Sequence, residues 1–102
     1  MYKLIALYRQ PQDCEAFDSH YESVHTPLVK QIPGLERLEV TRISGTPMGK
    51  PASFYLLAEM YFSDEAAFQK AMASRENRAT GKDLMSFAGD IVDVMVGEVT
   101  EA

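Results

Sequence analysis

Residues 54–62 read FYLLAEMYF, the most apolar of the segments that predict a strand. Apart from Glu59, apolar side chains occupy both alternating faces, which is typical of a strand covered on both sides. Residues 2–9 and 91–99 share this character and predict two more strands. Residues 35–43 alternate charged with apolar side chains and predict a fourth strand, at a sheet edge with one solvated face.

Two helical regions separate these strands. The first, residues 13–32, places apolar residues at spacings of four, three and four, on one helical face: Phe17, Tyr21, Val24 and Leu28. Pro27 interrupts the pattern, and Thr26 before it is a good N-cap, so we expect a kinked or two-part helix with its joint at residues 25–27. The second region starts at residues 63–64, and Ser74 predicts a fresh cap for a short helix over residues 75–85.

The order of elements predicts the fold class. Strand-helix-strand-strand-helix-strand, with the second helix broken in two, fits an α+β, ferredoxin-like sandwich with an antiparallel sheet, and the 102 residues fit one domain over residues 1–102. In that fold the helices cover only one face of the sheet. Three predicted strands are nevertheless apolar on both faces, and a large uncovered apolar patch usually marks an interface. The sequence therefore predicts a homodimer with its sheets packed face to face.

The composition bears on compartment and partners. The net charge is −5 and the ten Lys and Arg are scattered, which argues against binding nucleic acid or an anionic membrane surface. The single cysteine, Cys14, excludes an internal disulfide and a cysteine-based zinc site. No segment resembles a secretory signal or approaches the ~20 apolar residues that span a bilayer, so we expect a soluble, cytoplasmic protein.

The segment HYESVHTPLV at residues 20–29, followed by IPGL at residues 32–35, resembles the EthD family, named for a protein linked to ethyl tert-butyl ether degradation. The run FAGD at residues 87–90 is also similar to it. The resemblance implies a dimeric α+β barrel with a cleft in each subunit, between the sheet and the first helix. It implies no single reaction, because related barrels include lactone isomerases, polyketide dehydratases and cyclases, cofactor-free monooxygenases and haem-degrading enzymes. The histidine of the family's H-x-P-L pattern corresponds to His25.

His25 is the best candidate for chemistry. The ordinary pKa of histidine is about 6.5, so the side chain can give and take protons at neutral pH. Its alternative role is to bond a backbone carbonyl that Pro27 leaves free. Tyr21, one turn before His25, is a candidate to orient His25 or to contact a bound small apolar molecule, and Leu28 and Tyr8 are the other candidate binding residues. Packing in the core is the favoured role for Tyr21, and packing in the core or at the interface is the favoured role for Tyr8.

His20 is expected to be a solvated surface histidine. Five positions separate it from His25, which is about 140° around a regular α-helix, so the two should not share a site. The same geometry argues against a metal bound by both, because helical metal pairs are spaced by three or four residues.

Three further residues invite two interpretations each. Glu59 and Asp93 stand in apolar strands, where an ion pair at the interface or rim is favoured over a general base beside the pocket. Arg9 or Arg42, on neighbouring strands, is the expected partner of Glu59. Cys14 lies near a helix N-terminus, which lowers a thiol pKa, but with no general base nearby in the sequence it is expected to be inert.

The sequence therefore predicts a small enzyme in which His25 moves a proton on a hydrophobic carbonyl, phenolic or lactone-like compound. Isomerisation, dehydration and cyclisation suit such a base, and no phosphate loop, dinucleotide fingerprint or metal cluster is present, so no cofactor is expected. A non-catalytic ligand-binding protein, or an accessory protein of a degradative oxidation pathway, is the alternative, because His25 has no evident catalytic partner. Haem binding is a further alternative, since one histidine can be an axial ligand.

Overall fold

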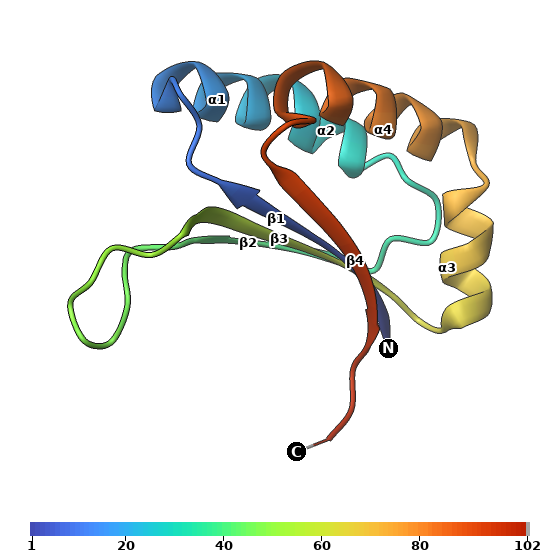
Figure 1. Ribbon diagram of the computed structural model, residues 1–102. Helices are drawn as coiled ribbons and strands as arrows, with labels where there is room; N and C mark the ends of the chain where they lie inside the picture. Colours follow the sequence, from blue (N-terminus) through green and yellow to red (C-terminus); the bar gives the residue numbers. More distant parts are fainter. Residues whose placement is uncertain (102) are drawn as a thin grey trace.

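The computed structural model of the chain describes residues 1–101 and shows an antiparallel sheet with helices on one face (Figure 1). Its strands are β1 (Tyr2–Arg9), β2 (Arg37–Arg42), β3 (Phe54–Phe62) and β4 (Val92–Glu98), and they lie in the order β2-β3-β1-β4. All four lie within the segments predicted from the sequence. The ferredoxin-like α+β fold is confirmed, and so is the edge position of β2, whose side chains are mostly exposed.

The helices are α1 (Cys14–His20), the π-helix η1 (Tyr21–His25), α2 (Thr26–Val29), α3 (Glu65–Met72) and α4 (Arg75–Ala88). The run from α1 to α2 is continuous and lies with α4 in one layer over the sheet, while α3 stands at one end (Figure 1). Side-chain caps begin α1, α3 and α4, where Asp13, Asp64 and Ser74 accept hydrogen bonds from backbone N–H groups. The predicted caps at Asp13 and Ser74 are confirmed, and α4 continues past residue 85 to Ala88.

The joint predicted at residues 25–27 is present, but as a wide turn rather than a kink with a new cap. The backbone N–H of Thr26 bonds to the carbonyl of Tyr21, five residues back, which is the π-helical pattern. Thr26 has helical dihedral angles, so the predicted cap at this residue is wrong. Pro27 accounts for the widening, because it lacks an N–H and its ring crowds the carbonyl one turn earlier.

The wide turn changes which side chains face the sheet. The buried residues of this run are four apart throughout: Phe17, Tyr21, His25 and Val29. Val24 is 42% exposed and Leu28 is only partly buried, so their predicted places on the buried face are wrong. A π-turn holds more residues than an α-turn, and the buried stripe therefore moves on by one position.

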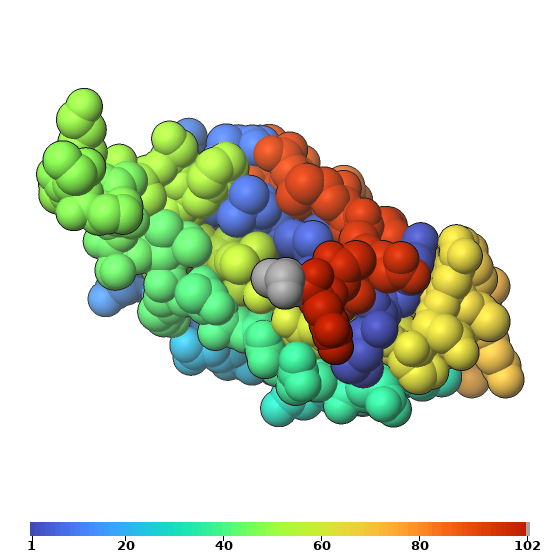
Figure 2. Space-filling model, turned by 90° about the horizontal axis from the view of Figure 1, so that it is seen from below, coloured from blue at the N-terminus to red at the C-terminus, as the bar shows by residue number. Residues whose placement is uncertain are grey.

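The face of the sheet away from the helices is open (Figure 2). Two cross-strand apolar pairs lie on it, Ile5 opposite Met95 and Leu7 opposite Leu57. These residues alternate along β1 with Ala6 and Tyr8, which are buried under the helices. Glu59 lies opposite Ile5 and Asp93 lies opposite Leu7, so the uncovered face is apolar at its centre on β1 but mixed with charged residues on β3 and β4.

Candidate functional site

A cavity of about 190 Å³ lies between the sheet and the helices. Ala6, Tyr8 and Val94 form part of its floor, and Tyr21 and His25 from η1 form part of its roof. Its remaining lining, from β1, β2, β3, α3, α4 and the segment after η1, is mostly aliphatic, so His25 is the one side chain in this lining whose ordinary pKa lies near neutral pH. This is where the cleft was expected, between the sheet and the first helical region.

His25 is held in one orientation by Asp83 of α4. The side chain is buried, with 4% of the residue exposed, and its Nδ1 lies 2.9 Å from Oδ2 of Asp83. An ionised carboxylate only accepts hydrogen bonds, so Nδ1 must carry the proton that it donates. The lone pair of neutral His25 is then on Nε2, which has no hydrogen-bond partner among residues 1–101.

Electrostatics favour this protonation state. Burial lowers the pKa of His25 below its usual 6.5, although the hydrogen bond and the negative charge of Asp83 oppose the change. Burial raises the pKa of the Asp83 carboxyl, but hydrogen bonds from His25 and His20 outweigh burial and leave that pKa below its usual 3.8. At neutral pH the pair is therefore a neutral imidazole beside a carboxylate, which is the state that a general base requires.

His20 shares the same carboxylate, against the expectation from the sequence. Its Nε2 lies 2.9 Å from Oδ1 of Asp83, and its side chain is 32% exposed. The prediction of a solvated histidine that shares no site with His25 is wrong. Residues five apart lie about one turn apart in a π-helix, so both imidazoles reach one side of the run.

The sequence analysis missed Asp83. The residue lies 58 positions after His25, on another element, so no spacing rule connects the two. The available signal was weak: aspartate is a poor residue for a helix interior, and Asp83 stands inside α4.

Of the predicted binding residues, Tyr8 and Tyr21 line the cavity and Leu28 does not. Tyr8 is fully buried, and its hydroxyl has no hydrogen-bond partner within residues 1–101. Burial raises the pKa of Tyr8 and also raises the pKa of Tyr21, to about 12, so both hydroxyls keep their protons. Val29, the neighbour of Leu28, takes the place in the lining, because of the shifted stripe described above.

The two strand carboxylates lie in ion pairs away from the cavity. Glu59 contacts Nζ of Lys3 at 2.6 Å, rather than the predicted Arg9 or Arg42, and neither residue lines the cavity. Asp93 contacts Arg9 at 2.7 Å. The ion-pair interpretation therefore fits both carboxylates. Cys14 accepts a hydrogen bond from Gln10, with 3.0 Å between Nε2 and Sγ.

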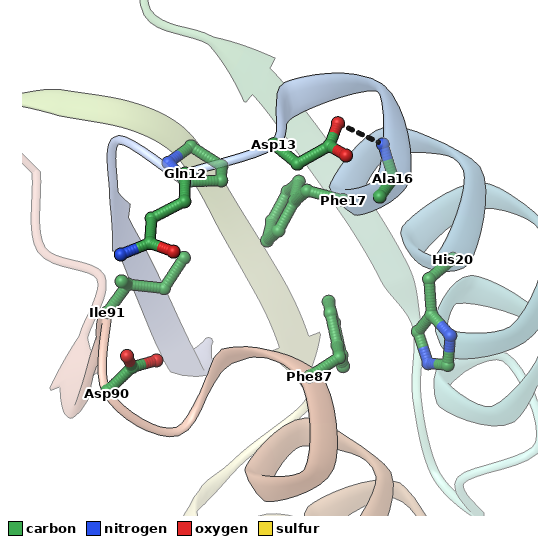
Figure 3. A pocket seen from close by; sticks show the side chains of 9 residues that line it. Gln12, Asp13, Ala16, Phe17, His20, Phe87, Asp90 and Ile91 are labelled. Atoms are coloured by element: carbon green, nitrogen blue, oxygen red, sulfur yellow. Dashed lines mark hydrogen bonds between the residues drawn. The ribbon is translucent and has the colours of Figure 1, made fainter.

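A second hollow of about 420 Å³ opens between the start of α1 and the C-terminal end of α4 (Figure 3). The rings of Phe17 and Phe87 point into it, and His20 lies at its edge (Figure 3). Asp13 and Asp90 line its opposite parts. We call this hollow the outer cleft.

Two other kinds of site are not found within residues 1–101. No three His, Cys, Asp or Glu side chains gather there in a way that would hold a metal ion. None of the helices in the same range is long and apolar enough to cross a membrane.

The fold and the cavity define a class: ferredoxin-like α+β proteins with an internal cavity under the helices. The EthD domain family matches residues 9–90, and the chain belongs to that family. A crystal structure of an ethyl tert-butyl ether (EthD) family protein from Bacillus halodurans C-125 is 52% identical, with a TM-score of 0.93 over 98% of this chain and 99% of that one.

Two other relatives extend the comparison. An uncharacterized 11.0 kDa protein from the thcB-thcC intergenic region of Rhodococcus erythropolis is 38% identical over 93% of this chain and 91% of its own length. A dimeric ferredoxin-like protein of unknown function from Jannaschia sp. CCS1 is 17% identical, with a TM-score of 0.67 over 97% of this chain and all of the other. At that identity the second likeness shows the fold alone.

Proposed function

We propose that this EthD family protein catalyses cofactor-free proton transfer on a small apolar compound, with His25 as the general base. The observation that carries the proposal is the His25–Asp83 pair. One imidazole nitrogen is fixed by a carboxylate at 2.9 Å, and the other is unpartnered in the wall of an apolar cavity. Asp83 fixes the tautomer and stabilises the imidazolium that forms when Nε2 takes a proton.

The size of the cavity narrows the substrate class. An apolar cavity of about 150 Å³ in another protein holds benzene, so about 190 Å³ suits a compound with a single ring. We infer a monocyclic ketone, phenol or lactone. Isomerisation, dehydration or cyclisation begins in each case with loss of a proton from an already acidic carbon or hydroxyl.

Tyr8 supplies the second polar contact in the proposal. A buried hydroxyl without a partner costs about 1–3 kcal/mol, and this cost is recovered when a ligand oxygen accepts its hydrogen bond. The Tyr8 hydroxyl is neutral, and Tyr8 is one of the residues that line the cavity. It would donate to the oxygen on which negative charge develops while His25 holds the proton.

Hydrogen–deuterium exchange tests the proposal without knowledge of the natural substrate. Cyclohexanone, phenylacetone and α-angelica lactone are incubated with the protein in deuterated buffer, and loss of the α-proton signal is followed by NMR. We expect faster exchange with at least one compound, reduced by ~10²–10⁴-fold in His25→Ala. Ser19→Ala, at an exposed position of α1, is the matched control. No acceleration with any compound, or undiminished exchange in His25→Ala, would contradict the proposal.

Binding without chemistry is the second candidate, since the Tyr8 hydroxyl and Nε2 of His25 can hold a ligand oxygen without removing a proton. In the same experiment it predicts line broadening of a bound compound that is recovered free of deuterium. Haem gains no support from the cavity, because about 190 Å³ lies below the roughly 300–1,000 Å³ of pockets for drug-sized ligands.

The proposal includes a homodimer formed through the open sheet face. Its support is the group of apolar residues on that face, Ile5, Leu7, Leu57 and Met95, together with the dimeric ferredoxin-like relative. Sedimentation at micromolar concentration should report twice the chain mass of 11.4 kDa. Leu57→Glu should yield folded monomer, whereas Val24→Glu, on the exposed helix surface, should remain a dimer. A monomeric wild-type protein would contradict this part of the proposal.

A further inference from the structure

Two imidazoles share a single carboxylate at the site. Oδ1 of Asp83 lies 2.9 Å from Nε2 of His20, and Oδ2 lies 2.9 Å from Nδ1 of His25. Asp83 carries one negative charge and therefore neutralises one imidazolium. If both imidazoles were protonated, a net positive charge would remain on a group of side chains that is largely removed from water.

The two imidazoles open to different spaces. His25 is 4% exposed and lines the internal cavity, whereas the side chain of His20 is 32% exposed and lines the outer cleft (Figure 3). The ring of Phe87 packs against both, with centroids 4.4 Å from His20 and 5.1 Å from His25. The Phe87 ring thus packs alongside the hydrogen bonds by which Asp83 joins the two histidines.

No carboxylate other than Asp83 forms a hydrogen bond with either imidazole within residues 1–101. Tyr8 and Tyr21 stand beside His25 and are neutral at ordinary pH. Asp13 and Asp90 line the outer cleft with His20, but the Asp13 carboxylate accepts the backbone N–H of Ala16 as a helix cap. Within residues 1–101, Asp83 is the carboxylate that forms hydrogen bonds with the two histidines.

We propose that His20, Asp83 and His25 form a charge-sharing triad in which the two imidazoles hold one positive charge between them, so that protonation of His25 in the cavity releases a proton from His20 into the outer cleft. In the singly charged triad with the charge on His20, His25 carries a proton on Nδ1 alone, which it donates to Asp83. The substrate proton then adds to Nε2 of His25, and the Nδ1 proton of His20 leaves to water. Asp83 stays ionised throughout, no proton crosses it, and the triad keeps zero net charge.

In this scheme His20 is a positioning residue that adjusts the basicity of His25. A positive charge on His20 opposes protonation of His25 across the carboxylate, and the lowered pKa of His25 includes such a contribution. The catalytic use of the triad rests on the proposed function. The sharing of charge does not, and it can be measured without a substrate.

The test is an NMR titration of the imidazole nitrogens in isotopically labelled protein. His20→Gln replaces the imidazole with an amide that still donates to Asp83 but carries no charge. We expect the pKa of His25 to rise by about one unit in this variant, a tenfold gain in proton affinity. An unchanged midpoint for His25 would overturn the proposal, because a purely structural His20 is replaced adequately by the amide. His20→Asn repeats the measurement if the first variant does not fold.

The exchange assay separates the two proposals. If His25 is the base and the triad shares charge, the acid limb of the exchange rate moves up by about one pH unit in His20→Gln, with the plateau retained. If the limb does not move while His25→Ala is inactive, charge sharing fails and the proposed function stands. If the wild-type protein catalyses no exchange but the NMR midpoint moves, the proposed function fails and charge sharing stands.

Discussion

Gly81→Ala should stabilise the protein and at the same time impair its cavity. Gly81 lies inside α4, and its Cα faces open space, since a Cβ built there meets no atom within 4 Å. The residue also belongs to the cavity lining. The added methyl group therefore enters empty volume rather than packed core.

Two contributions set the magnitude. Alanine is favoured over glycine inside a helix by about 0.8–1.0 kcal/mol. A fully buried methyl group contributes up to about 0.8 kcal/mol more, and partial burial of position 81 reduces that figure. The free energy of unfolding should rise by about 1–2 kcal/mol, which for a domain of this size raises Tm by at least about 4 °C.

The assay is urea or thermal unfolding at one protein concentration, with Gly89→Ala as the matched control. A Cβ at Gly89 would lie 3.0 Å from the carbonyl oxygen of Met85 and 3.1 Å from its sulfur, so that variant should gain no stability or lose some. The exchange assay should show slower turnover in Gly81→Ala, because the methyl group occupies part of the cavity. A destabilised Gly81→Ala, or one as active as wild type, would refute this account of the cavity.

Two further outcomes follow from the buried polar groups. Because the pKa of His25 in the folded protein lies below 6.5, the unfolded chain binds more protons at this residue, and the free energy of unfolding should fall as the pH drops below about 6.5. The lowered pKa of Asp83 adds a further loss of stability at more acid pH. Urea unfolding measured at several pH values should show that the loss just below pH about 6.5 is missing in His25→Gln. Tyr8→Phe removes a buried hydroxyl without a partner, so the variant should be as stable as the wild type or about 1 kcal/mol more stable. Calorimetry should nevertheless show weaker binding of an oxygen-bearing ligand. A clear loss of stability would show that the hydroxyl has a partner in the folded protein.

The fold could be predicted because its signals are local. Short apolar runs marked three strands, alternation of charged with apolar side chains marked the fourth, and the caps at Asp13 and Ser74 marked two helix starts. The need for a cover on the open face followed from strands that are apolar on both sides. Each of these inferences uses residues within a few positions of one another.

The site could be predicted only at His25, Tyr21 and Tyr8. The α-helical spacing gave the wrong buried face after Tyr21, because Pro27 widens the turn before it into a π-turn rather than starting a new helix. That single difference removed Leu28 from the lining and brought His20 to Asp83. Asp83 itself reaches the site through packing of α4 against η1, which local patterns do not encode.

The π-turn also restricts where residues can be inserted into the chain. Each residue advances an α-helix by about 100°, and the π-turn already holds one extra residue, so insertion of one more residue between His20 and His25 would turn every later side chain of the run away from its present neighbour. Insertions or deletions at residues 44–53, an exposed segment between β2 and β3, disturb no such phase. Insertions among related chains should therefore accumulate in that segment and be absent from residues 20–29.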